Sequence, residues 1–245
     1  MSWEDFSTDF DLFVEELSKV PDTERTSHSL YSISMSMKQS WLRLMRVKAA
    51  DIPIPLPRNK NLHPRQCSLD DAFLSFEFEL GKDFESDCVP YISNFQVKVK
   101  GTLELDNSFV SLEDHWRVDS HAFPAMPEPK EPHPYIHFQR GGHAQDEFSS
   151  QPNFVPGHCL PAVDGEFWQG LMQYSGPRMP TPPYCPILAI DMVIGQHNGD
   201  VWRSLRARHS YRKVVADAQR RLWDPFFAGL SNSTVRNRWL GKVLV

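Results

Sequence analysis

Between residues 73 and 139, apolar and polar side chains alternate over several short segments, and this pattern constrains the fold more than any other feature. Apolar residues occupy every second position in 76–80, in most of 91–106 and again in 116–120. A period of two is typical of strands with one face buried and the other in water. These segments predict an antiparallel β meander of four or five strands.

The polar positions of the same segments predict how neighbouring strands pair. Lys98 and Lys100 lie on the polar face of one strand, and Glu77 and Glu79 lie on that of the strand before it. Opposite charges facing each other across two strands stabilise a sheet. We therefore expect these lysines and glutamates to form cross-strand ion pairs.

Helical periodicity flanks the predicted sheet. Apolar residues recur at steps of three and four from Trp3 to Val20, after a possible N-cap at Ser2, and from about Ser27 to Ala49. Pro186 suits the first turn of a C-terminal helix, and Pro225 is expected to end the last one. We predict a single α+β domain over 1–245, with N-terminal helices in 1–50, the antiparallel sheet in 70–140, a Pro/Gly-rich loop region in 141–186 and C-terminal helices in 187–245.

Composition indicates a cytoplasmic protein with a sizeable core. Of the 245 residues, 40% are hydrophobic, and the four cysteines form no CxxC pair, as expected of free thiols in a reducing compartment. The opening MSWEDFSTDF is acidic, unlike a secretory signal, and the best apolar run, residues 187–194, is too short to span a bilayer. No membrane association is expected.

Charge is distributed unevenly along the chain. The net charge is −5, yet residues 196–245 hold ten Lys and Arg against three Asp and Glu, leaving 16 against 28 in the first 195. The basic C-terminal region could bind the phosphates of a nucleic acid, pair with the acidic N-terminal half or meet an acidic protein partner. Its aromatic residues fall at helical core spacing, which favours pairing with acids. The oligomeric state is left open.

The stretch HPYIHFQRGGH, residues 133–143, is the predicted centre of a binding surface. Prolines upstream of it exclude a helix and a central strand, and in the short strand that follows, Tyr135, His137 and Gln139 project from one face. A second proline-rich stretch, GPRMPTPPY, begins at Gly176. The candidate binding residues are His137, Gln139, Arg140, His143, Arg178 and Asp191.

Asp191 is included because it interrupts an otherwise apolar helical segment. A buried acid needs a cation or several hydrogen-bond donors. Arg178 and Arg140 are the candidate partners, and the pair is interpreted as structural in preference to ligand-binding.

Four histidines, His133, His137, His143 and His158, lie within 26 residues. Neutral imidazole is a common metal ligand, but the spacing matches no zinc motif and no HEXXH sequence is present. We therefore predict no metal site and no cofactor, and a metal-dependent hydrolase or nuclease is the third functional hypothesis.

The order of elements, the His133-Pro134 pair and the Gly-His-Cys-Leu stretch at 157–160 resemble ubiquitin-conjugating enzymes, whose motif is His-Pro-Asn followed by a catalytic cysteine. The resemblance implies a catalytic Cys159 with His158 and His133 beside it. The chain departs from the family where Tyr135 replaces the asparagine and where Cys159 lies farther downstream. These departures fit an altered or non-catalytic relative.

The leading functional hypothesis is a non-catalytic protein-interaction subunit of a bacterial cytoplasmic complex. It binds a protein partner through the two proline-braced loops, since loops displayed by a rigid sheet are common binding elements. The alternative is a protein similar to ubiquitin-conjugating enzymes that uses Cys159.

Overall fold

A computed structural model shows an α+β fold, which confirms the predicted fold class. It describes residues 2–40, 45–58, 67–81, 90–105, 108–120, 136–140, 170–171 and 182–233. The helices are α1 (Trp3–Ser18), the 3₁₀ turn η1 (Pro21–Thr23), α2 (Glu24–Ser40), α5 (Pro186–His197), α6 (Gly199–Ala207) and α7 (His209–Gly229). The strands are β1 (Arg46–Pro53), β2 (Ser68–Glu79), β3 (Ile92–Leu105), β4 (Ser108–Ser120), β5 (Ile136–Arg140) and β6 (Gly170–Leu171).

Strands β1 to β5 follow one another across the sheet as an antiparallel meander. The short β6 pairs in parallel with β4, where Leu112 faces Gly170. The predicted antiparallel sheet is therefore confirmed, with β1 and β5 at its two ends.

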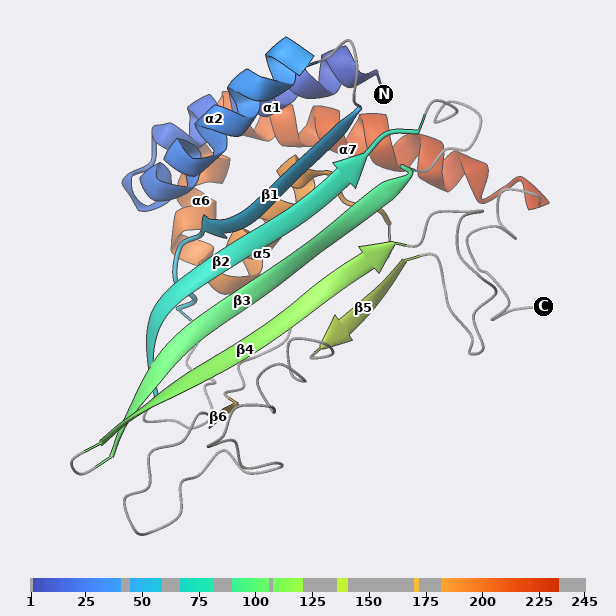
Figure 1. Ribbon diagram of the computed structural model, residues 1–245. Coiled ribbons are helices and arrows are strands. Elements are labelled where there is room, and N and C mark those ends of the chain that lie inside the picture. The colour runs from blue at the N-terminus through green and yellow to red at the C-terminus, as the bar shows by residue number, and fades with distance from the viewer. Residues whose placement is uncertain are drawn as a thin grey trace.

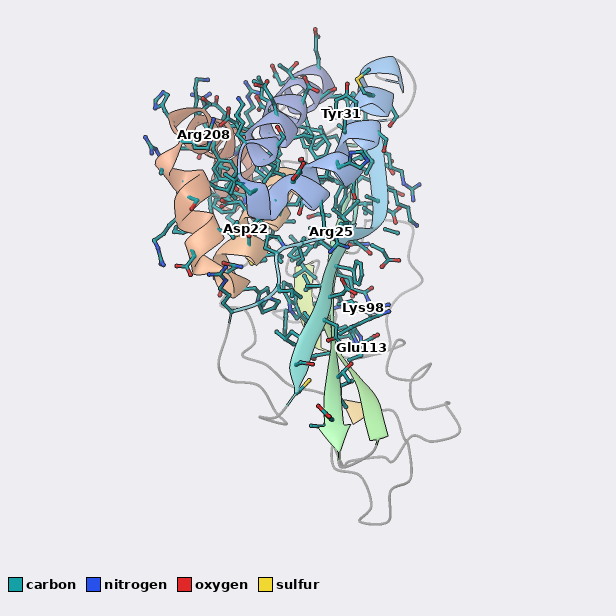
Figure 2. The ribbon with its side chains drawn as sticks, turned by 90° about the vertical axis from the view of Figure 1, so that its left-hand side faces the viewer. Asp22, Arg25, Tyr31, Lys98, Glu113 and Arg208 are labelled. Atoms are coloured by element: carbon teal, nitrogen blue, oxygen red, sulfur yellow. The ribbon has the colours of Figure 1, made fainter. Side chains whose placement is uncertain are left out.

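The described helices lie on one side of this sheet. Figure 1 shows them behind the strands, and Figure 2, turned by 90°, shows the far half of the β3–β4 hairpin extending beyond them. We call the opposite side of β1–β5 the open face. Within the described residues, no helix is both long and apolar enough to cross a membrane.

Helix α1 forms the centre of the core. Its apolar stripe is fully buried, and the Phe6 ring lies 5.1 Å from that of Phe78 on β2. Phe13 packs at 5.4 Å from Tyr211 on α7. The predicted N-cap is also confirmed, because the backbone N–H of Asp5 donates to the Ser2 hydroxyl at 3.1 Å.

The basic C-terminal region pairs with the acidic N-terminal helix, as the charge distribution predicted. The Arg208 Nε donates to Glu16 at 2.7 Å, and Arg221 donates to Asp9 at 2.5 Å. Burial raises the pKa of Asp9 above its ordinary value despite Arg221. Burial also opposes ionisation of Glu16, but hydrogen bonds from Lys19 and Arg208 outweigh it and lower the pKa of Glu16.

The second N-terminal helix was predicted too long. Helix α2 ends at Ser40, and residues 46–53 form β1, the first strand of the sheet. Val47 and Ala49 point into the core from β1, which pairs with β2. Their burial in the sheet outweighs the helical spacing of the apolar residues in this segment. The strand is irregular near its end, where Asp51 has a positive φ of 51° within a register shift.

The predicted cross-strand ion pairs are also wrong. Lys98 lies opposite Phe73 and Lys100 opposite Asp71, because the β2–β3 register is shifted from the predicted one. Glu77 instead pairs with Arg46 and Lys48 of β1, which had been placed in a helix.

Pro225 lies inside α7 and does not end it. A proline in a helix interior removes one backbone hydrogen bond. Leu222 and Phe226 are both buried on either side of it, and this packing supports the helix as far as Gly229.

His197, at the end of α5, should make stability depend on pH. Its ring is buried 5.9 Å from that of Trp116, and burial lowers its pKa to about 4 from an ordinary 6.5. Between these values the unfolded chain binds a proton that the folded chain does not. The contribution of His197 to stability is therefore complete above pH 6.5 and falls by about 3 kcal/mol as the pH drops towards 4.

Substituting His197→Gln removes this titration. Urea unfolding measured at several pH values should give the variant a shallower decline in free energy of unfolding over that window. Parallel declines in the two proteins would contradict the assignment.

Candidate functional site

The structure brings two of the predicted binding residues to the open face. His137 and Gln139 lie on β5 and point to the same side, as the alternation predicted, and they face Asp119 and Arg117 on β4. We call Arg117, Asp119, His137 and Gln139 the β4–β5 cluster. Tyr135 and His143 lie outside the described residues, and of Arg140 only the backbone is described.

Hydrogen bonds hold the Arg117 side chain in place within this cluster. Its Nε and Nη2 donate to the Gln139 side-chain oxygen at 3.2 and 2.5 Å, and its Nε also lies 2.6 Å from an Asp119 carboxylate oxygen. The His137 Nε2 lies 3.9 Å from the same oxygen. The Arg117 guanidinium is thus held by the Gln139 amide on β5 and by the Asp119 carboxylate on β4, the strand that also carries Arg117.

The β4–β5 cluster is neither buried nor fully solvated. Exposed fractions of the side chains are 25% for Arg117, 20% for Asp119 and 19% for His137. Partial burial and fixed geometry reduce the entropy that these groups lose on binding. The arrangement can offer donors from Arg117 and acceptors from Asp119 to a polar ligand.

The open face continues from the cluster across β4 and β3. Gln96 lies opposite Arg117, and Lys100 opposite Glu113. Figure 2 shows Lys98 and Glu113 on the side of the strands away from the helices. His115, opposite Lys98, is 5% exposed although its strand position points to this face. The face is therefore polar and charged of both signs.

Sequence reasoning missed Arg117 and Asp119. The alternation in residues 116–120 placed both on the polar face of a strand, which was a usable signal. It did not indicate that β5 would pair with β4 in the register that sets Gln139 beside Arg117, because register depends on long-range packing.

Asp191 is held by residues of α6 and α7, whereas its predicted partner Arg178 and the side chain of its other predicted partner, Arg140, lie outside the described part of the chain. The Asp191 carboxylate accepts from the Arg206 Nε at 3.1 Å, from the Tyr211 hydroxyl at 3.0 Å and from the indole N–H of Trp202 at 3.2 Å. A second bond comes from Arg206, whose guanidinium also lies 5.1 Å from the Trp202 ring. Asp191 thus ties α5 to α6 and α7, and these contacts favour the structural interpretation.

A pocket of about 270 Å³ lies beside Asp191, between α5, α6 and α7. Aromatic rings of Tyr184, Trp202 and Trp223 and the amides of Gln196 and Gln219 line it. Since the neighbouring carboxylate is already neutralised by Arg206, the pocket provides mainly apolar contact.

The residues implied by the resemblance to ubiquitin-conjugating enzymes are not described. Cys159, His158 and His133 lie outside the described residues, as does Arg178. Burial raises the pKa of the Cys67 thiol to about 11 and that of Cys185 to about 12, so both stay protonated near neutral pH. In the described ranges, no group of three or more His, Cys, Asp or Glu could hold a metal ion.

The basic residues of the C-terminal helices are engaged within the protein. Each of those between 203 and 221 donates to an acceptor of the chain; they are Arg203, Arg206, Arg208, Arg212, Lys213, Arg220 and Arg221. Groups that already pair with carboxylates or carbonyls contribute less to phosphate binding. This observation disfavours the nucleic-acid hypothesis for this part of the chain.

Comparisons with known proteins do not assign the site: no family model, curated protein or solved structure matches the chain.

Removing the Asp191 carboxylate should destabilise the protein strongly. Asp191→Ala leaves a half-buried guanidinium, a buried hydroxyl and an indole N–H without their acceptor. Breaking a buried ion pair costs about 3 kcal/mol. Urea unfolding at neutral pH measures the loss.

Asp200→Ala is the matched control. Asp200 also pairs with arginines, Arg58 and Arg203, but its side chain is 58% exposed. Exposed pairs contribute less than about 1 kcal/mol. Similar losses for both substitutions would contradict the structural role of Asp191.

Proposed function

We propose that the chain is a non-catalytic protein-interaction subunit of a bacterial cytoplasmic complex, and that it binds its partner across the open face at the β4–β5 cluster. The observation that carries this proposal is the fixed, half-buried Arg117, held between Gln139 and Asp119. Arginine is enriched among the residues that dominate the energetics of protein interfaces.

The geometry suits a protein ligand. Arg117 offers a planar set of donors that fits peptide carbonyls and carboxylates, and Asp119 beside it accepts from N–H and hydroxyl groups. Two pairs of facing residues, Gln96 with Arg117 and Lys100 with Glu113, extend this surface of donors and acceptors along β3 and β4. A partner with both donors and acceptors would match it.

Pairing of a partner strand with the edge at β1 is less well supported. The register shift between Ala49 and Ile52, with the positive φ of Asp51, interrupts the ladder there. Bulges of this kind protect sheet edges against pairing with other chains. The face of the sheet is therefore the better surface.

Affinity capture tests the proposal. The tagged full chain is expressed in its native cells, and proteins that copurify with it are quantified by mass spectrometry. Arg117→Ala should reduce recovery of the main partner by about tenfold or more, since loss of an arginine that dominates an interface costs about 2 kcal/mol or more. The fold is checked by circular dichroism.

Arg220→Ala is the control, because Arg220 also pairs with an aspartate but lies 65% exposed on α7. It should keep the partner, and so should Cys159→Ala. Undiminished recovery with Arg117→Ala would refute the proposal. A thioester trapped on Cys159 would replace it with the conjugating-enzyme alternative.

A further inference from the structure

A groove between α1 and α2 forms a second surface, separate from the open face. Its volume is about 520 Å³. Four of its residues come from α1 and five from α2: Asp11, Val14, Glu15 and Ser18, and Glu24, Ser27, His28, Tyr31 and Met35. Both helices thus contribute a continuous stripe of side chains.

The groove exposes large apolar side chains. Tyr31 is 60% exposed and Met35 is 38% exposed. Both lie on the side of α2 that lines the groove, together with Glu24 and His28. Figure 2 labels Tyr31 on α2, among the helices and away from the β3–β4 hairpin. Apolar residues gathered on one exposed surface mark interaction sites.

The groove is also acidic. Asp11 and Glu15 come from α1, and Glu24 lies in the first turn of α2. Lys19 pairs with Glu15, whose side chain is 61% exposed, and with Glu16. Asp9 and Glu16 lie on the other side of α1, which faces α7. Asp9 pairs with Arg221 of α7, and Glu16 pairs with Arg208, the residue just before α7. The groove side of α1 receives none of these arginines among the described residues.

We propose that this groove docks a basic amphipathic helix of a partner protein. Its apolar stripe packs on Tyr31 and Met35, and its Lys or Arg side chains face Glu15 and Glu24. Helix-in-groove recognition uses such apolar anchors at helical spacing. The apolar contacts supply most of the affinity, whereas the acids select a basic partner and accelerate its association. The proposal stands independently of the open face.

Fluorescence anisotropy with the full chain tests this. The probe is a labelled synthetic peptide of about 18 residues, long enough to form a helix, made of Leu and Lys with the leucines at i, i+3, i+4 and i+7. A second peptide has the same composition in scrambled order, so that it has equal charge but no apolar stripe. Only the first should bind tightly, and added salt should weaken it.

Substitutions locate the site. Tyr31→Ala should weaken binding of the amphipathic peptide about tenfold, and Glu15→Gln with Glu24→Gln should reduce the salt dependence. The matched controls are Tyr91→Ala, since Tyr91 is 38% exposed before β3, and Glu104→Gln, an exposed acid on β3. Both controls should bind as the unaltered chain does. Glu15→Gln and Glu24→Gln are combined in one variant, and every other substitution is made singly.

Three outcomes would overturn the proposal. They are equal binding of the scrambled peptide, equal weakening by Tyr91→Ala, and unchanged binding after Tyr31→Ala. Sedimentation of the chain alone adds a fourth: a dimer that Tyr31→Ala dissociates would show a second copy, not a basic helix, in the groove.

Discussion

The whole architecture depends on one helix, α1, being packed between the sheet and the last helix. Its buried phenylalanines reach Phe78 of β2 through Phe6 and Tyr211 of α7 through Phe13. On the same side, its buried acids Asp9 and Glu16 meet Arg221 and Arg208. Apolar burial supplies the driving force, and the ion pairs fix the orientation, because a buried charge left unpaired is costly.

Because α1 and the C-terminal helices occupy one face of the sheet, none of the described helices covers the opposite face. The helices also divide the charges of the chain. Several arginines of the basic C-terminal region pair instead with acids of α1, with Asp191 and with Asp217. Among the described residues, Glu15 and Glu24 of the α1–α2 groove form no ion pair with these arginines, so that the two proposed surfaces differ in chemical character.

Sequence reasoning recovered features that depend on local pattern. The period of two indicated β2, β3 and β4, the stripe of phenylalanines indicated α1, and the position of Ser2 indicated its cap. Features that depend on tertiary contact were missed. Residues 46–53 form a strand because they pair with β2, and the contact of Asp191 with Arg206, 15 positions later, was not predicted. The alternation predicted that Arg117 lies on a polar face. Its contact with Gln139 depends on the β4–β5 register, which the alternation did not predict.

The link between α1 and α7 also bears on biosynthesis. Asp9 and Arg221 are separated by 212 positions, and Glu16 and Arg208 by 192. At about 5–20 residues per second, a ribosome adds the arginine partners roughly 10–40 seconds after the acids. During that interval the nascent first helix has neither its arginine partners Arg208 and Arg221 nor the aromatic cover from Tyr211. The native contacts of α1 with α7 can form only after α7 has been synthesised, and contacts between residues so far apart in the sequence form slowly.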